Sequence, residues 1–265
     1  MFTDLEGLLA WKGLAVLAWL GLLFLAERWR PAARPLPVQG PVAGGWHRVL
    51  RNVGLWLTVS VLSPLIVLPL TFWASGQALD WRPAWWTGLP GLALDIVLLD
   101  VLIYWWHRAN HEIPLLWRFH EVHHLDRFLD TTSALRFHFG EVLLSALARA
   151  GVILLLGFPF ASVLVFEVLV LFSAIFHHSN LRLPDGMERA LSRVVITPSI
   201  HWVHHHARRA DTDSNYGTIF SFWDPLFGTR SAKQRDPEMV IGTQGRAEEG
   251  LVSLLLHPFR FGPRA

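Results

Sequence analysis

Apolar stretches close to bilayer length constrain the fold of this 265-residue chain most strongly. Three of them run roughly over residues 8–26, 53–73 and 89–106, and a bilayer crossing needs about 20 residues. A fourth region, 141–176, holds two shorter apolar arms around Gly157-Phe158-Pro159, which is a turn signal. We therefore expect an all-α integral membrane protein, a bundle of four to five transmembrane helices made of three spans plus a two-arm hairpin.

The chain divides by composition into three parts. Residues 1–92 are expected to form N-terminal transmembrane spans and loops, and residues 93–229 a catalytic domain that contains the membrane hairpin 141–176. Residues 230–265 begin as a polar segment and end in an amphipathic helix over 247–259, which we expect on the protein or bilayer surface. The apolar side of that helix carries Leu251, Leu254 and Leu255.

Charges flanking the spans predict the orientation. The hairpin returns the chain to the side it left, so the segments before and after it share one membrane face. Arginines are concentrated in the first loop and between residues 107 and 141, whereas the second loop has only Arg82. The counted residues are Arg28, Arg30, Arg34, Arg48 and Arg51, then Arg108, Arg118, Arg127 and Arg136. By the positive-inside rule these regions are cytoplasmic, in the inner membrane of a bacterium or the endoplasmic reticulum of a eukaryote.

Composition excludes several classes of protein. The chain has no cysteine, which rules out disulfides, zinc–thiolate sites, iron–sulfur clusters and cysteine nucleophiles. A formal net charge of +2 without an aromatic-basic stripe gives no case for binding nucleic acid. Asp4 and Glu6 stand where a signal peptide would be basic, so the first stretch is expected to be a retained membrane anchor.

Histidine is the residue that carries chemistry here. Twelve of the fourteen histidines lie between His107 and His206, and eight of these form boxes of the types HxxxH, HxxHH and HxxHH. The members of the boxes are His107, His111, His120, His123, His124, His201, His204 and His205. Spacings of three and four place side chains on one helical face, while adjacent ones diverge by about 100°. One HxxHH box can therefore donate to two ions, and eight imidazoles suit a two-metal site at the cytoplasmic face.

Other residues extend this expected site. His178, at the end of the second hairpin arm, is expected to be a ninth metal ligand, and His138 and His177 are further possible metal or substrate contacts. Metal-bound imidazoles usually donate their second N–H to a carboxylate or carbonyl. Asp100, on the same helical face as His107, is expected to accept such a bond, with Tyr104 and Asn180 also supporting the ligands.

Charges inside the hairpin form a separate prediction. Arg149 and Glu167 each lie nine positions from Phe158, so they face one another across the two arms. An unpaired charge within a bilayer is costly, and we therefore predict that they form an ion pair.

The residues alone leave the metal and the reaction open. An all-imidazole site accepts iron, zinc or copper. Oxidation of a lipid C–H bond, hydrolysis by a di-zinc membrane enzyme, and transport or sensing of metal are all compatible with the boxes. A transporter would place its ligands near the bilayer midplane, whereas these lie at or beyond the span ends. Sterol, fatty-acyl, carotenoid and ether lipids remain possible substrates.

The order of the boxes around a hydrophobic hairpin resembles the fatty acid hydroxylase/sterol desaturase superfamily. So do Trp117-Arg118-Phe119-His120, Leu135-Arg136-Phe137-His138, His178-Ser179-Asn180, Asn215-Tyr216-Gly217 and Trp223-Asp224-Pro225-Leu226-Phe227-Gly228-Thr229. The resemblance spans about residues 93–229. One departure is Phe139, followed by Gly140 and Glu141, where relatives often have proline.

This resemblance implies a membrane-bound di-iron enzyme that hydroxylates or desaturates a sterol or fatty-acyl C–H bond. The implied ligands are the eight box histidines and His178. Two iron ions (zinc in the purified protein being possible) and O2 as co-substrate are implied. So is a separate electron-transfer protein or reductant, since no flavin, haem or nicotinamide motif is present.

Overall fold

Helices make up the regular secondary structure of the computed structural model, which describes residues 5–34 and 45–260 and, within 5–10, the backbone only. Asp4 and residues 35–44 of the first loop lie outside those residues. The long helices are α1 (Leu5–Trp29), α2 (Gly45–Leu62), α4 (Gly88–Glu112), α6 (Phe139–Leu156) and α7 (Phe160–His178). No β-strand occurs within the two described ranges, so the all-α prediction is confirmed.

Four stretches of helix are long and apolar enough to cross a membrane, judged over the described residues. They are Gly45–Gly76, Gly88–Glu112, Phe139–Leu156 and Phe160–His178. The first combines α2, a π-helical segment η1 (Ser63–Val67) and α3 (Leu68–Gly76). Pro64 has no N–H to donate to the preceding turn, which accounts for the wider turn at this point. The 25-residue α1 contains the expected first span.

The predicted hairpin consists of two helices, α6 and α7. Gly157 ends α6 in the left-handed conformation, with φ of 69°, and Pro159 precedes α7. A glycine suits this turn because other residues adopt a positive φ at a cost. A Cβ there would also lie 2.8 Å from the carbonyl oxygen of Leu79. The arms have 18 and 19 residues, so each is long enough to span.

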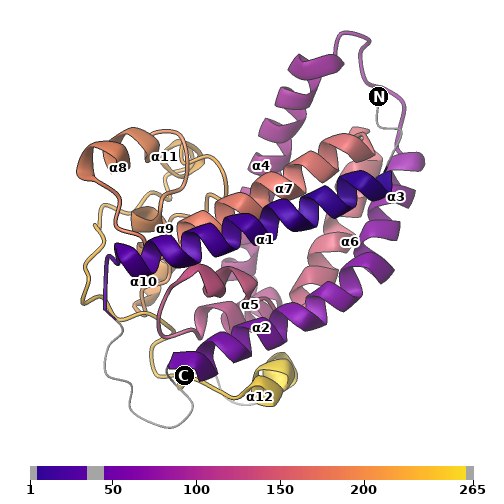
Figure 1. The fold of residues 1–265 in the computed structure, drawn as a ribbon. Helices are drawn as coiled ribbons and strands as arrows, with labels where there is room; N and C mark the ends of the chain where they lie inside the picture. Colours follow the sequence, from indigo (N-terminus) through magenta and orange to yellow (C-terminus); the bar gives the residue numbers. More distant parts are fainter. Residues whose placement is uncertain (1–4, 35–44, 261–265) are drawn as a thin grey trace.

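The core between the long helices is apolar. Ile96 and Leu99 of α4, Ile153 of α6, and Val163 and Phe166 of α7 belong to one buried cluster. Helix α1 lies along α7 (Figure 1), where Trp19 Nε1 donates to the carbonyl oxygen of Phe172 at 3.0 Å.

The predicted pair between Arg149 and Glu167 is present, with 3.4 Å between Arg149 Nη2 and Glu167 Oε1. Lys12 of α1 also contacts Glu167, at 2.7 Å. The pair is therefore part of a three-charge cluster that links α1, α6 and α7, and its third member, Lys12, was not predicted.

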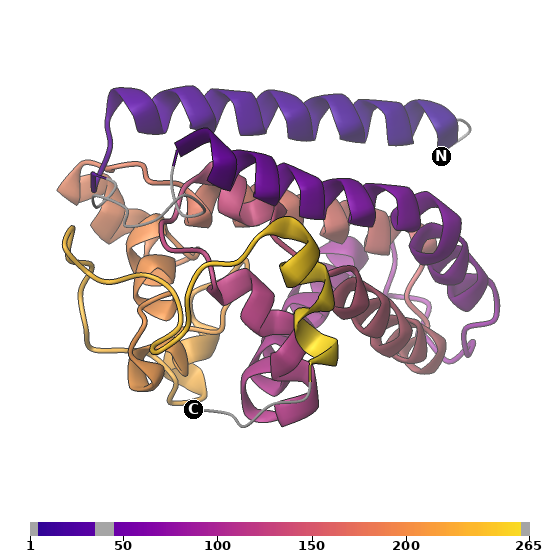
Figure 2. The same cartoon turned by 90° about the horizontal axis from the view of Figure 1, so that it is seen from below.

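Shorter helices gather at one end of the long ones, away from α3 (Figure 1). They are α5 (Pro114–His124), η2 (Thr131–Leu135), α8 (Asp185–Leu191), α9 (Pro198–His204), α10 (Arg209–Thr212) and α11 (Trp223–Leu226). The C-terminal segment adds α12 (Leu251–Leu256) and η3 (His257–Phe259), which lie near α5 and α2 (Figure 2). An amphipathic helix was expected over 247–259. The observed helix α12 is shorter than that and begins after Gly250.

A buried ionic network fixes this end of the bundle. Arg48 contacts Asp126 at 2.6 Å and also pairs with Asp130, while Arg136 contacts Glu248 at 2.9 Å. Burial would raise the pKa of Asp126, but Arg48 and Arg136 outweigh it and hold that pKa below its ordinary value. Arg48 and Arg51 were expected in the first loop. That expectation is wrong, because both belong to α2 and are buried.

Candidate metal centre

Four helices deliver nine histidine side chains to one buried region. Helix α4 carries His107 and His111 past the apolar part of its sequence, and α7 ends at His178. Helices α5 and α9 begin at Pro114 and Pro198, whose fixed φ suits a first helical turn. Each of these short helices carries one HxxHH box on or immediately after its last turn.

The nine rings form two groups. One consists of His107, His111, His120, His124 and His204, and the other of His123, His178, His201 and His205. Within each group every residue offers a ring nitrogen within 4.8 Å of the others. Both HxxHH boxes are divided between the groups, because adjacent residues of a helix point in different directions.

Oxygen acceptors fix the tautomer of six rings, each at Nδ1. Four acceptors are backbone carbonyls and two are carboxylates, and the Nδ1 to oxygen distances lie between 2.7 and 3.2 Å. The pairs are His107 with Tyr216 O, His111 with Asp213, His120 with Glu141, His123 with Arg136 O, His178 with Ala174 O, and His204 with Ser214 O. Because each Nδ1 donates its hydrogen, Nε2 of a neutral ring carries a lone pair.

Two such lone pairs face each other between His123 and His178. Their Nε2 atoms lie 3.0 Å apart, yet both rings have their hydrogen on Nδ1. Neither nitrogen can donate to the other, so this contact is repulsive unless a cation lies between the two lone pairs. The buried Nε2 atoms of His111 and His204 likewise have no hydrogen-bond partner. Buried polar atoms are normally satisfied, and a metal ion would satisfy these.

The spacing of the nitrogens also fits metal ligands. Contacts between Nε2 atoms of neighbouring rings run from 2.9 to 3.2 Å. Ligands at right angles on an ion with metal–nitrogen bonds of about 2.1 Å would lie about 3.0 Å apart. The donor set and its spacing therefore fit transition metal ions in both groups.

Burial keeps these imidazoles neutral. Removal from water lowers the pKa values of five rings well below that of an exposed histidine, and neighbouring imidazoles lower them further. The five are His123, His124, His201, His204 and His205. A neutral ring is the form that binds metal, so the site does not have to lose protons near pH 7 before it binds an ion.

Several residues expected at the site lie outside both groups. His138 caps α6: its Nδ1 accepts from Gly140 N at 2.9 Å, and Nε2 donates to Leu255 O at 3.0 Å. Both its nitrogens are thus occupied, and it contacts the C-terminal segment rather than a ligand. His177 is buried with its ring centroid 4.0 Å from that of His201, but it joins neither group.

The prediction that Asp100 accepts a hydrogen bond from a metal-binding histidine is wrong. Its carboxylate accepts from Ile219 N, Phe220 N and Trp223 Nε1 at 2.8–3.1 Å, and no contact joins it to a histidine ring. The seven residues from Asp100 to His107 amount to about 10 Å along a helix, which is too far for one hydrogen bond. Asp100 instead holds the segment 219–223 against α4.

Tyr104 and Asn180 also have other partners. Tyr104 Oη lies 2.8 Å from Thr229 Oγ1. The side chain of Asn180 is hydrogen bonded to both backbone groups of Ala33, so it joins the segment after α1 to the end of α7.

The acceptors that do hold the rings were not found by sequence reasoning. Asn215 has a φ of 55°, a left-handed conformation that asparagine adopts more readily than most residues. It separates Ser214 and Tyr216, whose carbonyl oxygens accept from His204 and His107. Asp224 fixes this turn by accepting from Tyr216 N and Gly217 N. The Asn-Tyr-Gly and Trp-Asp-Pro motifs could be recognised in the sequence, but the histidines that their residues support could not.

Fold and site together define a membrane helix bundle with a buried double cluster of histidines at one end. The fatty acid hydroxylase family model matches residues 92–229, just over half of the chain. The chain belongs to this family, which confirms the resemblance seen in its motifs.

Relatives with known names are lipid hydroxylases and monooxygenases. The chain is 28% identical over 215 residues to an ornithine lipid hydroxylase of Rhizobium tropici, covering 80% of this chain and 64% of the relative. It is 32% identical over 154 residues to an alkylglycerol monooxygenase of Danio rerio, covering 57% of this chain and 32% of the relative.

A cholesterol 25-hydroxylase of Rattus norvegicus is 24% identical over 239 residues, which cover 84% of this chain and 74% of the relative. The chain thus spans less than two thirds of the first two relatives. No solved structure matches it.

Proposed function

We propose that this protein is a membrane-bound di-iron oxidoreductase that uses O2 to hydroxylate a C–H bond of a lipid. Its nine clustered histidines would hold two iron ions, with His107, His111, His120, His124 and His204 on one and His123, His178, His201 and His205 on the other. The named relatives support a lipid substrate, and the boxes support the metals. Desaturation of the same class of substrate is the alternative reaction.

One observation carries this proposal: the facing lone pairs of His123 and His178 at 3.0 Å. Two bound iron ions would supply the activation of O2 and the oxidation of an unactivated C–H bond. Hydroxylation consumes one O2, two electrons and two protons, and yields the alcohol and water. The electrons would come from an external donor, a separate protein or reductant.

The chain's own residues hold and shield the metal centre. The Nδ1 acceptors orient six of the rings, so that their Nε2 atoms need no rearrangement before binding. Phe137 stacks on His123 with centroids 4.6 Å apart, and Trp117 lies 5.0 Å from His111. These aromatic rings exclude bulk water, which protects an oxidising reaction from side reactions.

The orientation of the protein belongs to the same proposal. Arginines near the histidine end favour the cytoplasmic face by the positive-inside rule. A cytoplasmic site would be within reach of soluble or membrane-attached reductants. A suitable reporter for the C-terminus is one that is active only in the periplasm or lumen. Activity of such a fusion would contradict this orientation.

Oxygen consumption tests the proposed reaction. Purified iron-loaded protein, supplied with a chemical reductant and a membrane lipid extract, should consume O2 and yield lipids heavier by one oxygen. His204→Ala should abolish both while the variant still inserts into membranes. Lipid cleavage without O2 would instead indicate a di-zinc hydrolase, and metal flux into proteoliposomes would indicate a transporter. Either result, with no O2-dependent product, would overturn the proposal.

A further inference from the structure

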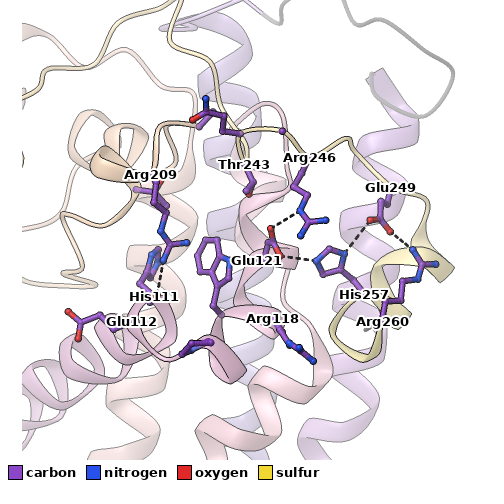
Figure 3. Close-up of a pocket in the computed structure, with 16 residues that line it drawn as sticks. His111, Glu112, Arg118, Glu121, Arg209, Thr243, Arg246, Glu249, His257 and Arg260 are labelled. Carbon is purple, nitrogen blue, oxygen red and sulfur yellow. Dashed lines mark hydrogen bonds and ion pairs between the residues drawn. The ribbon is translucent and has the colours of Figure 1, made fainter. Parts of the chain in front are cut away.

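A charged cavity of about 800 Å³ lies beside the first histidine group, between α5 and the C-terminal segment (Figure 3). His111 lines it at one side, with Trp117 next to it. The side chain of His111 is buried, and its Nε2 is one of the unpartnered nitrogens of the metal centre. Because no part of the His111 side chain is exposed, the cavity ends against the wall of the metal centre and does not open into it.

Positive charge predominates inside the cavity. Its lining has four arginines against three glutamates. The arginines are Arg118, Arg209, Arg246 and Arg260, and the glutamates are Glu112, Glu121 and Glu249.

His257 lies between Glu121 and Glu249, at 3.0 and 3.2 Å, and Arg260 also contacts Glu249, at 3.1 Å. Hydrogen bonding to Glu121, aided by the charges of both glutamates and opposed by burial, raises the pKa of His257. A protonated His257 adds to the positive charge of the cavity.

Arg246 is only loosely held, since its Nε lies 3.6 Å from Glu121. Guanidinium groups bind carboxylate and phosphate oxygens through paired hydrogen bonds. The cavity is thus suited to an anionic group that is small enough to enter it.

Exposed apolar side chains stand on the two elements that border this charged interior, α5 and the C-terminal segment. Leu115 at the start of α5 is 61% exposed, and Val252, Leu256 and Phe259 of the C-terminal segment are 50–70% exposed. Phe259 packs against Phe119 of α5 with ring centroids 5.8 Å apart, so apolar contacts join the two elements next to the cavity. An apolar surface around a polar cavity is suited to an amphipathic ligand.

The C-terminal wall lies at the level where α2 becomes apolar. Leu251 packs so closely against Gly54 that a Cβ there would lie 2.6 Å from the leucine side chain. Gly54 stands at the beginning of the apolar stretch over 53–73, where the chain is expected to enter the bilayer. The cavity and its apolar rim therefore lie near the depth of lipid headgroups. This position favours a lipid over an acidic protein partner, which would meet the apolar rim first.

We propose that this cavity binds the anionic headgroup of the lipid substrate, with the acyl chains leaving across the apolar rim into the bilayer. The assignment rests on the proposed function. Because the headgroup would lie beside His111, the C–H bonds nearest the metal centre are those of the headgroup and of the first carbons next to it. Oxidation is therefore expected at the polar end of the lipid.

Binding of a short-chain lipid tests this assignment. The full-length protein in detergent is titrated calorimetrically with dihexanoyl phosphatidate, dihexanoyl phosphatidylcholine and inorganic phosphate. Phosphatidate should bind about tenfold more tightly than either of the others. Arg246→Gln and Arg260→Gln should each weaken phosphatidate binding about fivefold, in keeping with the loss of one partly exposed charge contact. Arg189→Gln, an exposed residue of α8 outside the cavity lining, is the matched control and should change nothing.

Three results would overturn the assignment: equal affinity in all the variants, equal affinity for the two lipids, or binding of inorganic phosphate as tight as that of phosphatidate. The last would mean that a free anion is the ligand. The titration contains no reductant, so it does not depend on turnover. Turnover with unchanged binding in the arginine variants refutes only the headgroup site, whereas arginine-dependent binding without any O2-dependent product refutes the proposed function.

The position of the added oxygen gives an independent check. Fragmentation of the product in a mass spectrometer should place the oxygen in the headgroup fragment or on the first carbons of an attached chain. An oxygen near the methyl end of an acyl chain would contradict the proposed placement.

Discussion

Replacing Glu141 should weaken metal binding at the first histidine group without unfolding the protein. Glu141 Oε1 accepts from His120 Nδ1 at 2.8 Å, and the two side chains are only 8% and 3% exposed. A buried hydrogen bond to a charged acceptor contributes about 1.5–3 kcal/mol. If that energy is used to hold His120 in its metal-binding tautomer, its loss lowers metal affinity by about 10–100-fold.

The substituent sets the size of the effect. Glu141→Ala removes the acceptor and should show the full loss, whereas Glu141→Gln keeps a neutral acceptor and should show a smaller one. Metal affinity is measured by competition with a coloured chelator, and thermal unfolding is followed in parallel. Glu112→Gln is the matched control, because Glu112 lies one position from His111 but its exposed carboxylate pairs with Arg108. Unchanged affinity in Glu141→Ala, or an equal loss in Glu112→Gln, would refute the reasoning.

Three further predictions concern the surroundings of the centre. Arg48→Ala leaves Asp126 without its closest cation and should destabilise the protein by about 3–5 kcal/mol, seen as a lower unfolding temperature in detergent; an unchanged temperature would contradict a buried network. Asp100→Asn should make the segment around Trp223 more sensitive to protease while metal affinity stays unchanged, and a large loss of affinity would restore the role first expected for Asp100. The raised pKa of His257 means that its stabilising contacts are complete below its unfolded-state pKa of about 6.5 and are lost as pH rises through the folded-state value. Release of the C-terminal segment by protease should therefore increase with pH, and His257→Gln should remove this dependence.

The sequence was sufficient for features that repeat locally. The apolar stretches, the Gly157 turn and the histidine spacings each depend on residues within a few positions, and the structure has helices where these patterns predicted them. The pairing of Arg149 with Glu167 followed from counting outward from the same turn. Lys12 could not be added to it, because which helix lies beside α7 depends on the packing of the whole bundle.

The acceptors around the histidines were out of reach for a different reason. Four of the six are backbone carbonyls, and every residue has one, so no residue type marks them. The expectation for Asp100 shows the risk of choosing a carboxylate by helical face alone. Its face was right, but the distance along the axis left it beside the segment 219–223.

Metal stoichiometry tests the central claim most directly. Purified full-length protein, reconstituted with Fe(II) under anaerobic conditions and freed of loose metal, should contain about two irons per chain by elemental analysis. His178→Ala, which removes a ligand from one group only, should retain about one, and its remaining iron should lose the magnetic coupling expected of a neighbouring pair. One iron or fewer per chain in the unaltered protein, or an unchanged content in His178→Ala, would contradict the account.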